Sequence, residues 1–283
     1  MRTGICTSDF KPSSVETIFK RINSYGISAI QFTYASFMMD EIPERIGDDT
    51  LIQIQRYSEK YDIEIVAGTA TFNMIDPDEG RLEENIRRMD QMCAANKKLG
   101  CSILSLCTGT LNPNSMWAPH PDNCSEVAWQ KLLQSMKRVV SIADKYDMTL
   151  AIETEASNVV MTPERARMLM DQIGYSRLKM IIDCANLFLP GQAHRENVDS
   201  VIQNAFQCFG KDIVLAHGKD IADTDGIQFV PTGEGIVNFD LFLDCLKQYG
   251  YTGDILLHGI YQMDKMKGCI DFMQDKIRQH GLN

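Results

Sequence analysis

Eight short runs of apolar, often β-branched residues recur along the chain, and longer segments with apolar residues every three or four positions separate them. The short runs have the length and composition of strands, and the longer segments have the period of helices. This alternation predicts a parallel sheet whose strands are joined by helical crossovers. The expected strands lie at residues 3–7, 29–34, 64–69, 102–107, 149–154, 178–183, 213–217 and 254–258.

The alternation continues without a low-complexity linker or an abrupt change in composition. We therefore predict one domain over residues 1–283, a closed (β/α)8 TIM barrel, a fold that typically needs about 250 residues. A doubly wound open sheet is the alternative. It is disfavoured because Gly4 is followed by Ile5, Cys6 and Thr7, where a dinucleotide-binding sheet would have the Gly-x-Gly-x-x-Gly turn.

Two of the expected helices have clear start signals. Thr162 is a hydroxyl N-cap before a proline at the first helical position, and Gly174 closes that segment. Ser125 is the expected cap of a helix over residues 126–146.

The chain carries 28 Lys and Arg residues against 38 Asp and Glu, a formal charge of −10. Because this charge repels phosphate backbones and anionic lipid surfaces, we expect neither nucleic acid nor a membrane as partner. Residues 1–10 lack the zones of a signal peptide, and no run approaches the roughly 20 apolar residues of a membrane helix. We therefore expect a cytoplasmic protein whose nine cysteines, without a Cys-x-x-Cys pair, are reduced thiols.

Four consecutive runs, the fifth to the eighth, end in an ionisable side chain: Glu153, Asp183, His217 and His258. In a TIM barrel these strand ends meet at the mouth where active sites lie, and the alternation of side chains lets all four point inward. One such residue alone is more often a helix cap or a satisfied core residue. Four left unpaired together would cost several kcal/mol, so we predict that they bind a divalent ion such as manganese, cobalt, iron or zinc.

Several stretches of the chain resemble the xylose isomerase-like barrels of the sugar phosphate isomerase and epimerase family, and the resemblance covers all eight units. The matching stretches are residues 108–110, 116–123, 152–155, 158–160, 183–186 and 216–220. The resemblance implies a single divalent ion, usually manganese, with cobalt, zinc, iron or magnesium as alternatives. Its ligands would be Glu153, Asp183 and His217, with a fourth from the end of strand eight. Many members carry a glutamate there, whereas this chain has His258, as a subgroup of the family does.

The chemistry that such a site supports is proton abstraction next to a carbonyl, through an enediolate. Glu153 would be the base as well as a ligand, and His258, Glu155 or Lys219 would supply the second proton. Lys219 has a second interpretation as a solvated loop lysine.

The expected substrate contacts lie on the loops of the mouth. Trp117 and His120 lie on the long loop after strand four, where the indole would stack on a sugar face. The resemblance adds Glu155, Asn186 and Asp220 as substrate-binding residues, although Asn186 has the alternative role of capping the next helix.

The leading hypothesis is a metal-dependent isomerase or epimerase acting on a sugar or keto-sugar, a small molecule. The alternative is a lyase of the same fold that cleaves a 3-keto-glycoside by β-elimination, which needs only one carbon base. An abasic-DNA endonuclease of the superfamily would need three metals and further histidines where the chain offers Tyr34, Thr69 and Thr108. An inert or regulatory barrel is the non-enzyme hypothesis, and a homodimer is the expected assembly.

Overall fold

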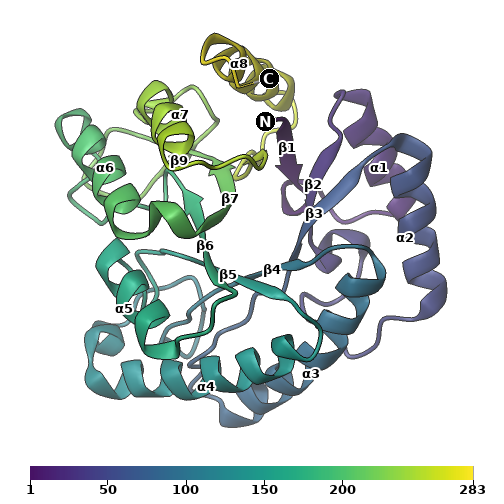
Figure 1. The fold of residues 1–283 in the computed structure, drawn as a ribbon, viewed down its shortest axis with the longest axis vertical. Helices are drawn as coiled ribbons and strands as arrows, with labels where there is room; N and C mark the ends of the chain where they lie inside the picture. Colours follow the sequence, from purple (N-terminus) through teal and green to yellow (C-terminus); the bar gives the residue numbers. More distant parts are fainter. Residues whose placement is uncertain (283) are drawn as a thin grey trace.

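Eight parallel strands close into a barrel in the computed structural model, which describes residues 1–282. Each strand pairs in parallel with its two neighbours, and β1 closes the ring against β10 (Figure 1). The predicted TIM barrel is therefore confirmed, and the open doubly wound sheet is wrong. The last residue of the expected domain, Asn283, lies outside the described residues. The barrel strands are β1 (Thr3–Cys6), β2 (Ala29–Phe32), β3 (Glu64–Thr69), β4 (Ile103–Leu106), β5 (Thr149–Glu153), β6 (Leu178–Asp183), β7 (Ile213–Gly218) and β10 (Ile255–Leu257).

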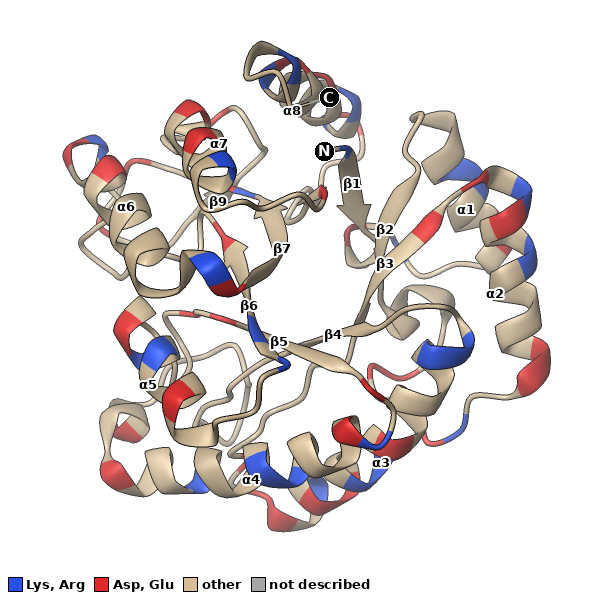
Figure 2. Ribbon diagram, viewed as in Figure 1, with Lys and Arg blue, Asp and Glu red and all other residues tan. Residues whose placement is uncertain are grey.

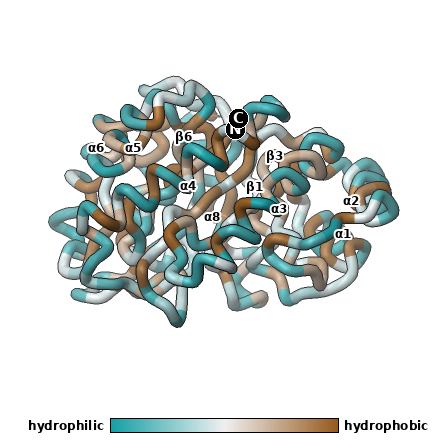
Figure 3. The backbone as a smooth tube through the Cα atoms, turned by 90° about the horizontal axis from the view of Figure 1, so that it is seen from below, coloured by the Kyte–Doolittle hydropathy of each residue, from teal (hydrophilic) through white to brown (hydrophobic). Residues whose placement is uncertain are grey.

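A ring of helices surrounds the strands in Figure 1 and carries most of the charged residues in Figure 2. Along these helices hydrophilic and hydrophobic positions interchange, as expected for helices with one buried face (Figure 3). None of the helices in the described part of the chain has the length and apolar character needed to cross a bilayer. The α-helices are α1 (Val15–Ser24), α2 (Asp48–Tyr61), α3 (Glu79–Lys98), α4 (Glu126–Asp144), α5 (Pro163–Ile173), α6 (Val198–Phe209), α7 (Phe239–Gln248) and α8 (Met266–Gln279).

The predicted helix signals are confirmed. The Ser125 side chain accepts a hydrogen bond from the backbone of Ala128, and the Thr162 side chain accepts one from Arg165. Gly174 ends α5 in the left-handed conformation, with φ 65°. The helix expected over 126–146 ends two residues earlier, at Asp144.

Short elements fill the loops at the mouth. An antiparallel hairpin of β8 (Asp220–Ile221) and β9 (Phe229–Val230) follows β7, and its two-residue strands are too short for apolar periodicity to predict. The 3-10 helices at the mouth are η1 (Thr7–Asp9), η2 (Tyr34–Phe37), η3 (Pro121–Cys124) and η4 (Arg195–Asn197), whereas η5 (Gly210–Asp212) precedes β7 at the opposite end of the barrel.

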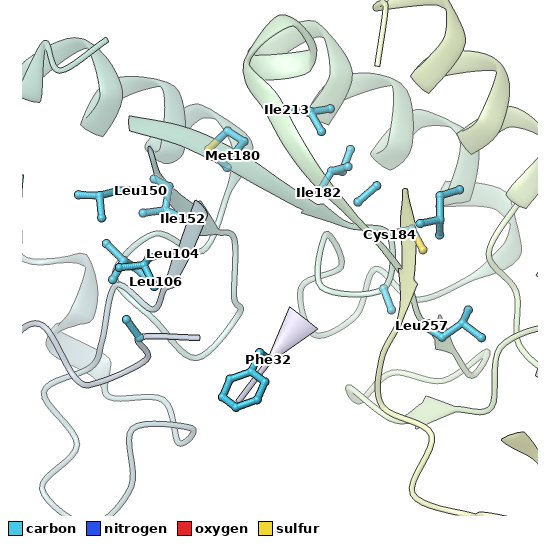
Figure 4. Packing of buried hydrophobic residues seen from close by; sticks show 14 of the residues in the cluster. Phe32, Leu104, Leu106, Leu150, Ile152, Met180, Ile182, Cys184, Ile213 and Leu257 are labelled. Atoms are coloured by element: carbon cyan, nitrogen blue, oxygen red, sulfur yellow. The ribbon is translucent and has the colours of Figure 1, made fainter. Parts of the chain in front are cut away.

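The interior of the barrel is filled by one small cluster, separate from the main core. Its members are Cys6, Ala29, Ala67, Ala151, Ile181, Leu215 and Leu256. Residues between them in sequence, such as Ile152 and Ile182, belong to the larger core between strands and helices, part of which Figure 4 shows. Because side chains alternate, residues two positions beyond Ala151, Ile181 and Leu215 also point inward, at the mouth.

The loop after β4 is fixed to the loop after β5 by the buried side chain of Asn158. Its Oδ1 accepts from the backbone N–H of Gly109 at 2.8 Å and from the Cys107 thiol at 2.7 Å. Its Nδ2 donates to the Met116 carbonyl at 3.3 Å and to the Ser157 hydroxyl at 3.2 Å. This amide thus contributes to holding the loop that carries Trp117.

The C-terminal helix α8 is held against α7 by His280. The imidazole lies 3.0 Å from Asp240 and 2.8 Å from Asp244, and the two carboxylates raise the pKa of His280. Lys276 also pairs with Asp240. Because α8 completes the barrel next to β1, the charge of this imidazole contributes to closing the fold.

A His280→Gln variant should therefore lose stability in a pH-dependent way. The folded-state pKa lies above the unfolded value of about 6.5, so the stabilisation is fully present below pH about 6 and is lost as the pH rises through the folded-state pKa. We expect the wild type to exceed the variant by at most about 1 kcal/mol near pH 6, in line with partly exposed pairs, and by less near pH 9. Urea unfolding across this pH range measures the difference; a gap that does not change with pH would contradict the assignment.

Candidate metal centre

Glu153, Asp183 and His217 meet at the mouth of the barrel, at the ends of three adjacent strands. Asp183 and His217 are register partners between β6 and β7, and one ligand atom from each of the three residues lies within 4.8 Å of the others. Nδ1 of His217 is 3.5 Å from Oδ2 of Asp183 and 3.8 Å from Oε2 of Glu153. The sequence prediction that these three strand ends converge is confirmed.

Two of these ligand atoms are buried without a hydrogen-bond partner among residues 1–282: Oδ2 of Asp183 and Nδ1 of His217. The other carboxylate oxygen of Asp183 accepts from the backbone N–H groups of Ala185 and Asn186, which fixes the direction of the free oxygen. Buried polar atoms are almost always satisfied, and a cation between these two would satisfy both. The residues present therefore fit a divalent ion.

The tautomer of His217 is set by Gln31 of β2, whose Oε1 lies 2.9 Å from the imidazole Nε2. The amide of Gln31 is itself anchored, because its Nε2 donates to the hydroxyls of Thr69 and Ser105 at 3.2 Å. With Nε2–H donating to Gln31, the lone pair of His217 lies on Nδ1, the atom that faces the carboxylates. Burial also lowers the pKa of His217, so the ring is held in the neutral form that binds metals.

The two carboxylates have different environments. Burial and the neighbouring Asp183 charge raise the pKa of Glu153 well above its ordinary value. Burial acts on Asp183 in the same direction, but Lys219 and His217 outweigh it and hold the pKa of Asp183 below its ordinary range. The cluster therefore has one carboxylate that stays ionised and one whose charge needs a further cation.

Lys219 is buried, which excludes the interpretation as a solvated loop lysine. Its ammonium donates to Oδ1 of Asn186 at 2.9 Å and lies 3.9 Å from Oδ2 of Asp183. The Phe229 ring of β9 covers it, with 3.5 Å between Nζ and the ring centroid. Asn186 in turn donates from Nδ2 to Glu153, so Lys219, Asn186 and Glu153 form one hydrogen-bonded chain.

His258, the fourth predicted ligand, lies beside the cluster but is not part of it. Its ring centroid is 5.5 Å from that of His217, and its Nδ1 lies 3.2 Å from a carboxylate oxygen of Asp9. The structure therefore brings together three of the four predicted ligands. A role for His258 as ligand or acid stays a prediction.

Asp9, in the turn after β1, is the main site residue that the sequence analysis missed. Its side chain is fully buried and accepts from Nδ1 of His258 and from the backbone N–H groups of Gly259 and Ile260. It thus orients His258 and the loop after β10. Its position three residues beyond β1 was the available signal, but it lies two residues past the end of the strand expected at residues 3–7.

The remaining predicted residues have different positions. Glu155 lies next to the cluster, and burial raises its pKa although Lys219 lowers it. Trp117 is 59% exposed on the loop after β4. His120 caps η3, accepting from the backbone N–H of Asp122 at 3.2 Å. Asp220 accepts four backbone N–H groups, so both of its oxygens shape the loop after β9, and its predicted contact with substrate stays a prediction.

Comparison with known proteins identifies the family of the chain. Residues 19–272 match the family model described as xylose isomerase-like TIM barrel. An uncharacterized protein of Methanocaldococcus jannaschii, MJ1311, is 21% identical over 270 residues, 94% of this chain and 86% of its own length. The probable L-ribulose-5-phosphate 3-epimerase UlaE of Mycoplasma pneumoniae is 26% identical over 178 residues, 62% of this chain and 52% of that protein.

Solved structures share the fold at low sequence identity. D-psicose 3-epimerase of Clostridium cellulolyticum H10, crystallised with D-tagatose, has a TM-score of 0.74 at 11% identity, covering 98% of this chain and 99% of that chain. The IOLI protein with a bound zinc atom has a TM-score of 0.72 at 18% identity, covering 98% of this chain and 96% of that chain. The probable 3-DHS dehydratase AsbF of Bacillus anthracis has a TM-score of 0.75 at 15% identity, covering 97% of this chain and 99% of that chain.

An Asp183→Asn variant should lose the metal ion. The amide oxygen can keep the hydrogen bonds to Ala185 and Asn186, but a neutral amide replaces the free anionic oxygen. After dialysis against manganese or cobalt, elemental analysis should find close to one ion per wild-type chain and almost none in the variant. The exposed Asp171→Asn on α5 is the matched control and should bind as the wild type does. Full occupancy in Asp183→Asn would refute the site.

An Asp9→Asn variant should destabilise the turn after β10. One carboxylate oxygen is replaced by an N–H group, which leaves a buried backbone donor without an acceptor. We expect a loss of about 1–3 kcal/mol in the free energy of unfolding, measured with urea. Asp264→Asn, at an exposed position of the same loop, should change it by less than about 0.5 kcal/mol. Equal effects of the two variants would show that Asp9 does not hold the turn.

Proposed function

Because the chain belongs to the xylose isomerase-like TIM barrel family, we propose that it is a divalent-metal-dependent isomerase or epimerase acting on a sugar or keto-sugar. The observation that carries the proposal is the pair of buried ligand atoms, Oδ2 of Asp183 and Nδ1 of His217, that lack a partner in the described chain. Glu153 adds a third ligand atom within 4.8 Å. Epimerases among the proteins of similar fold agree with this proposal.

An ion held by Glu153, Asp183 and His217 would act as a Lewis acid on a carbonyl and the neighbouring hydroxyl of the substrate. Glu153 then removes the proton from the carbon next to that carbonyl, which gives an enediolate. Asn186 fixes the orientation of the Glu153 carboxylate during this transfer.

The second proton comes from a residue near the cluster or from solvent. Lys219, Glu155 and His258 are the candidates, and they differ in what holds them. Lys219 is bound to Asn186, Glu155 is 3.4 Å from the Ser157 hydroxyl, and His258 is bound to Asp9. The Asp9 carboxylate also fixes the orientation of the His258 ring.

Manganese is the ion that we propose first, with cobalt, zinc, iron or magnesium as alternatives. Two carboxylates and one imidazole are a mixed oxygen and nitrogen set that accommodates each of these ions. The IOLI neighbour was crystallised with zinc, which supports a divalent ion in this fold.

A lyase that cleaves a 3-keto-glycoside by β-elimination is the second candidate. It is favoured by the absence of a carboxylate at the end of β10, where His258 stands, because elimination needs one carbon base and epimerisation needs two groups. The probable 3-DHS dehydratase among the structures of similar fold supports this candidate, since a dehydration is an elimination.

A Glu153→Gln variant should lose at least about 100-fold in metal-dependent exchange of the substrate α-proton, the size of a general-base contribution. Nuclear magnetic resonance in D2O, with manganese-loaded protein and a panel of ketohexoses and 3-keto-glucosides, measures the exchange. The exposed Glu126→Gln on α4 is the control. Exchange that survives in Glu153→Gln with the ion still bound would show that another residue is the base.

The same incubations separate the two reactions. Epimerisation conserves the mass of the substrate, whereas elimination releases a free aglycone that chromatography detects. A wild-type protein that neither exchanges the α-proton nor releases an aglycone on this panel would count against both proposals and favour an inert barrel.

A further inference from the structure

A cavity of about 400 Å³ lies at the mouth of the barrel, away from the three metal-binding strand ends. It is formed by the loops that follow β2, β3 and β4 and by the first turns of α3. Its volume is within the range of small-molecule sites. Neither the metal cluster nor the proposed proton transfers use any residue of its lining.

The positive charges around this cavity are already paired. The guanidinium of Arg81 binds the buried carboxylate of Asp76 through two nitrogens. Arg88 donates to Glu84 at 2.8 Å and to the carbonyl of Ile42 at 2.9 Å. These bonds hold each guanidinium in place and an acidic neighbour balances its charge, so the two arginines attract an anionic ligand less than unpaired arginines would.

The free polar groups of the cavity are neutral or acidic. The side chains of Thr71, Asn85 and Asn114 have no hydrogen-bond partner within residues 1–282, and neither has the carboxyl of Glu41. Burial raises the pKa of Glu41 to about 7, so that this carboxyl can donate as well as accept near neutral pH. Apolar side chains complete the wall: Ile42, Phe72 and Met116. Unpaired amides and hydroxyls beside apolar surface are the chemistry that binds the hydroxyls and C–H faces of a sugar.

The cavity and the metal centre share one wall, the loop after β4. On the cavity side, Asn73 binds both the N–H and the carbonyl of Thr110. On the other side, the Met116 carbonyl accepts from Asn158, whose amide also donates to Ser157, the partner of Glu155. A ligand that reaches across this loop could occupy both places.

We propose that this cavity is a subsite for an uncharged, hydroxyl-bearing group of the substrate, such as a second sugar ring. The substrate of the metal centre is then a disaccharide or glycoside and not a sugar phosphate. The inference rests on the proposed function, since it takes the metal centre to be where the keto-sugar reacts. Two observations support the subsite: the arginines of the cavity are paired, and its neutral polar groups are unpaired.

Saturation-transfer NMR and calorimetry on the manganese-loaded protein test the proposal. The probes are cellobiose, lactose, maltose and trehalose, with glucose and glucose 6-phosphate for comparison. We expect at least one disaccharide to bind more tightly than both monosaccharides. An Asn85→Leu or Thr71→Val variant should weaken that binding about ten-fold, the effect of one lost hydrogen bond to a buried partner. Asn23→Leu, at an exposed position of α1, is the matched control and should leave it within about two-fold.

Three results would overturn the subsite: glucose 6-phosphate as the tightest probe, no disaccharide preferred over glucose, or disaccharide binding unchanged in both variants. These outcomes are separate from the fate of the proposed reaction. Disaccharide binding that depends on Asn85, in a wild-type protein without α-proton exchange, would keep the subsite and reject the reaction. Exchange on ketohexoses without disaccharide binding would keep the proposed reaction and reject the subsite.

Discussion

A carboxylate oxygen and an imidazole nitrogen face each other 3.5 Å apart at the mouth of the barrel, and neither has a partner in the described chain. Leaving such a pair unsatisfied is costly, and the surrounding residues prevent the pair from relaxing. Backbone amides hold Asp183 from one side, and Gln31 holds His217 from the other. The fold thus maintains an arrangement that a divalent ion would complete, as expected for a preorganised metal site.

The barrel fold itself brings the side chains of the candidate metal centre together. Small interior residues, among them Ala67 and Ala151, let the strands close around a narrow interior. The alternation that buries Ala151, Ile181 and Leu215 inside also directs the last residues of the same strands to the mouth. A helix or loop could hold such side chains as well, but with less precision than paired strands, whose register fixes every residue along the ring.

The difference between local patterns and contacts across the barrel explains which features could be predicted from the sequence. Strand periodicity is local, so β3 and β6 begin and end where they were expected, and Glu153, Asp183 and His217 could be identified from their strand ends. Hydrogen bonds between segments far apart in the chain are not local. Asp9 acts on His258 across 249 positions, and Gln31 acts on His217 across 186. Both lie in unremarkable sequence, and only the closure of β1 against β10 and β2 gives them their roles. The β8–β9 hairpin, whose Phe229 covers Lys219, was missed because its two-residue strands are too short for apolar periodicity to predict.

The charges of the centre also bear on the kind of reaction it can support. Glu153 and Asp183 contribute two negative charges, and the buried ammonium of Lys219 contributes one positive charge. A divalent ion would bring the sum for these groups to about +1 by their ordinary charges, and the neighbouring Glu155, when ionised, would bring it to about zero. The ion and the buried ammonium of Lys219 would stabilise negative charge that develops on a substrate oxygen, as it does when a proton leaves the carbon next to a carbonyl. Both epimerisation and elimination begin with that step, so these two positive charges favour this class of chemistry.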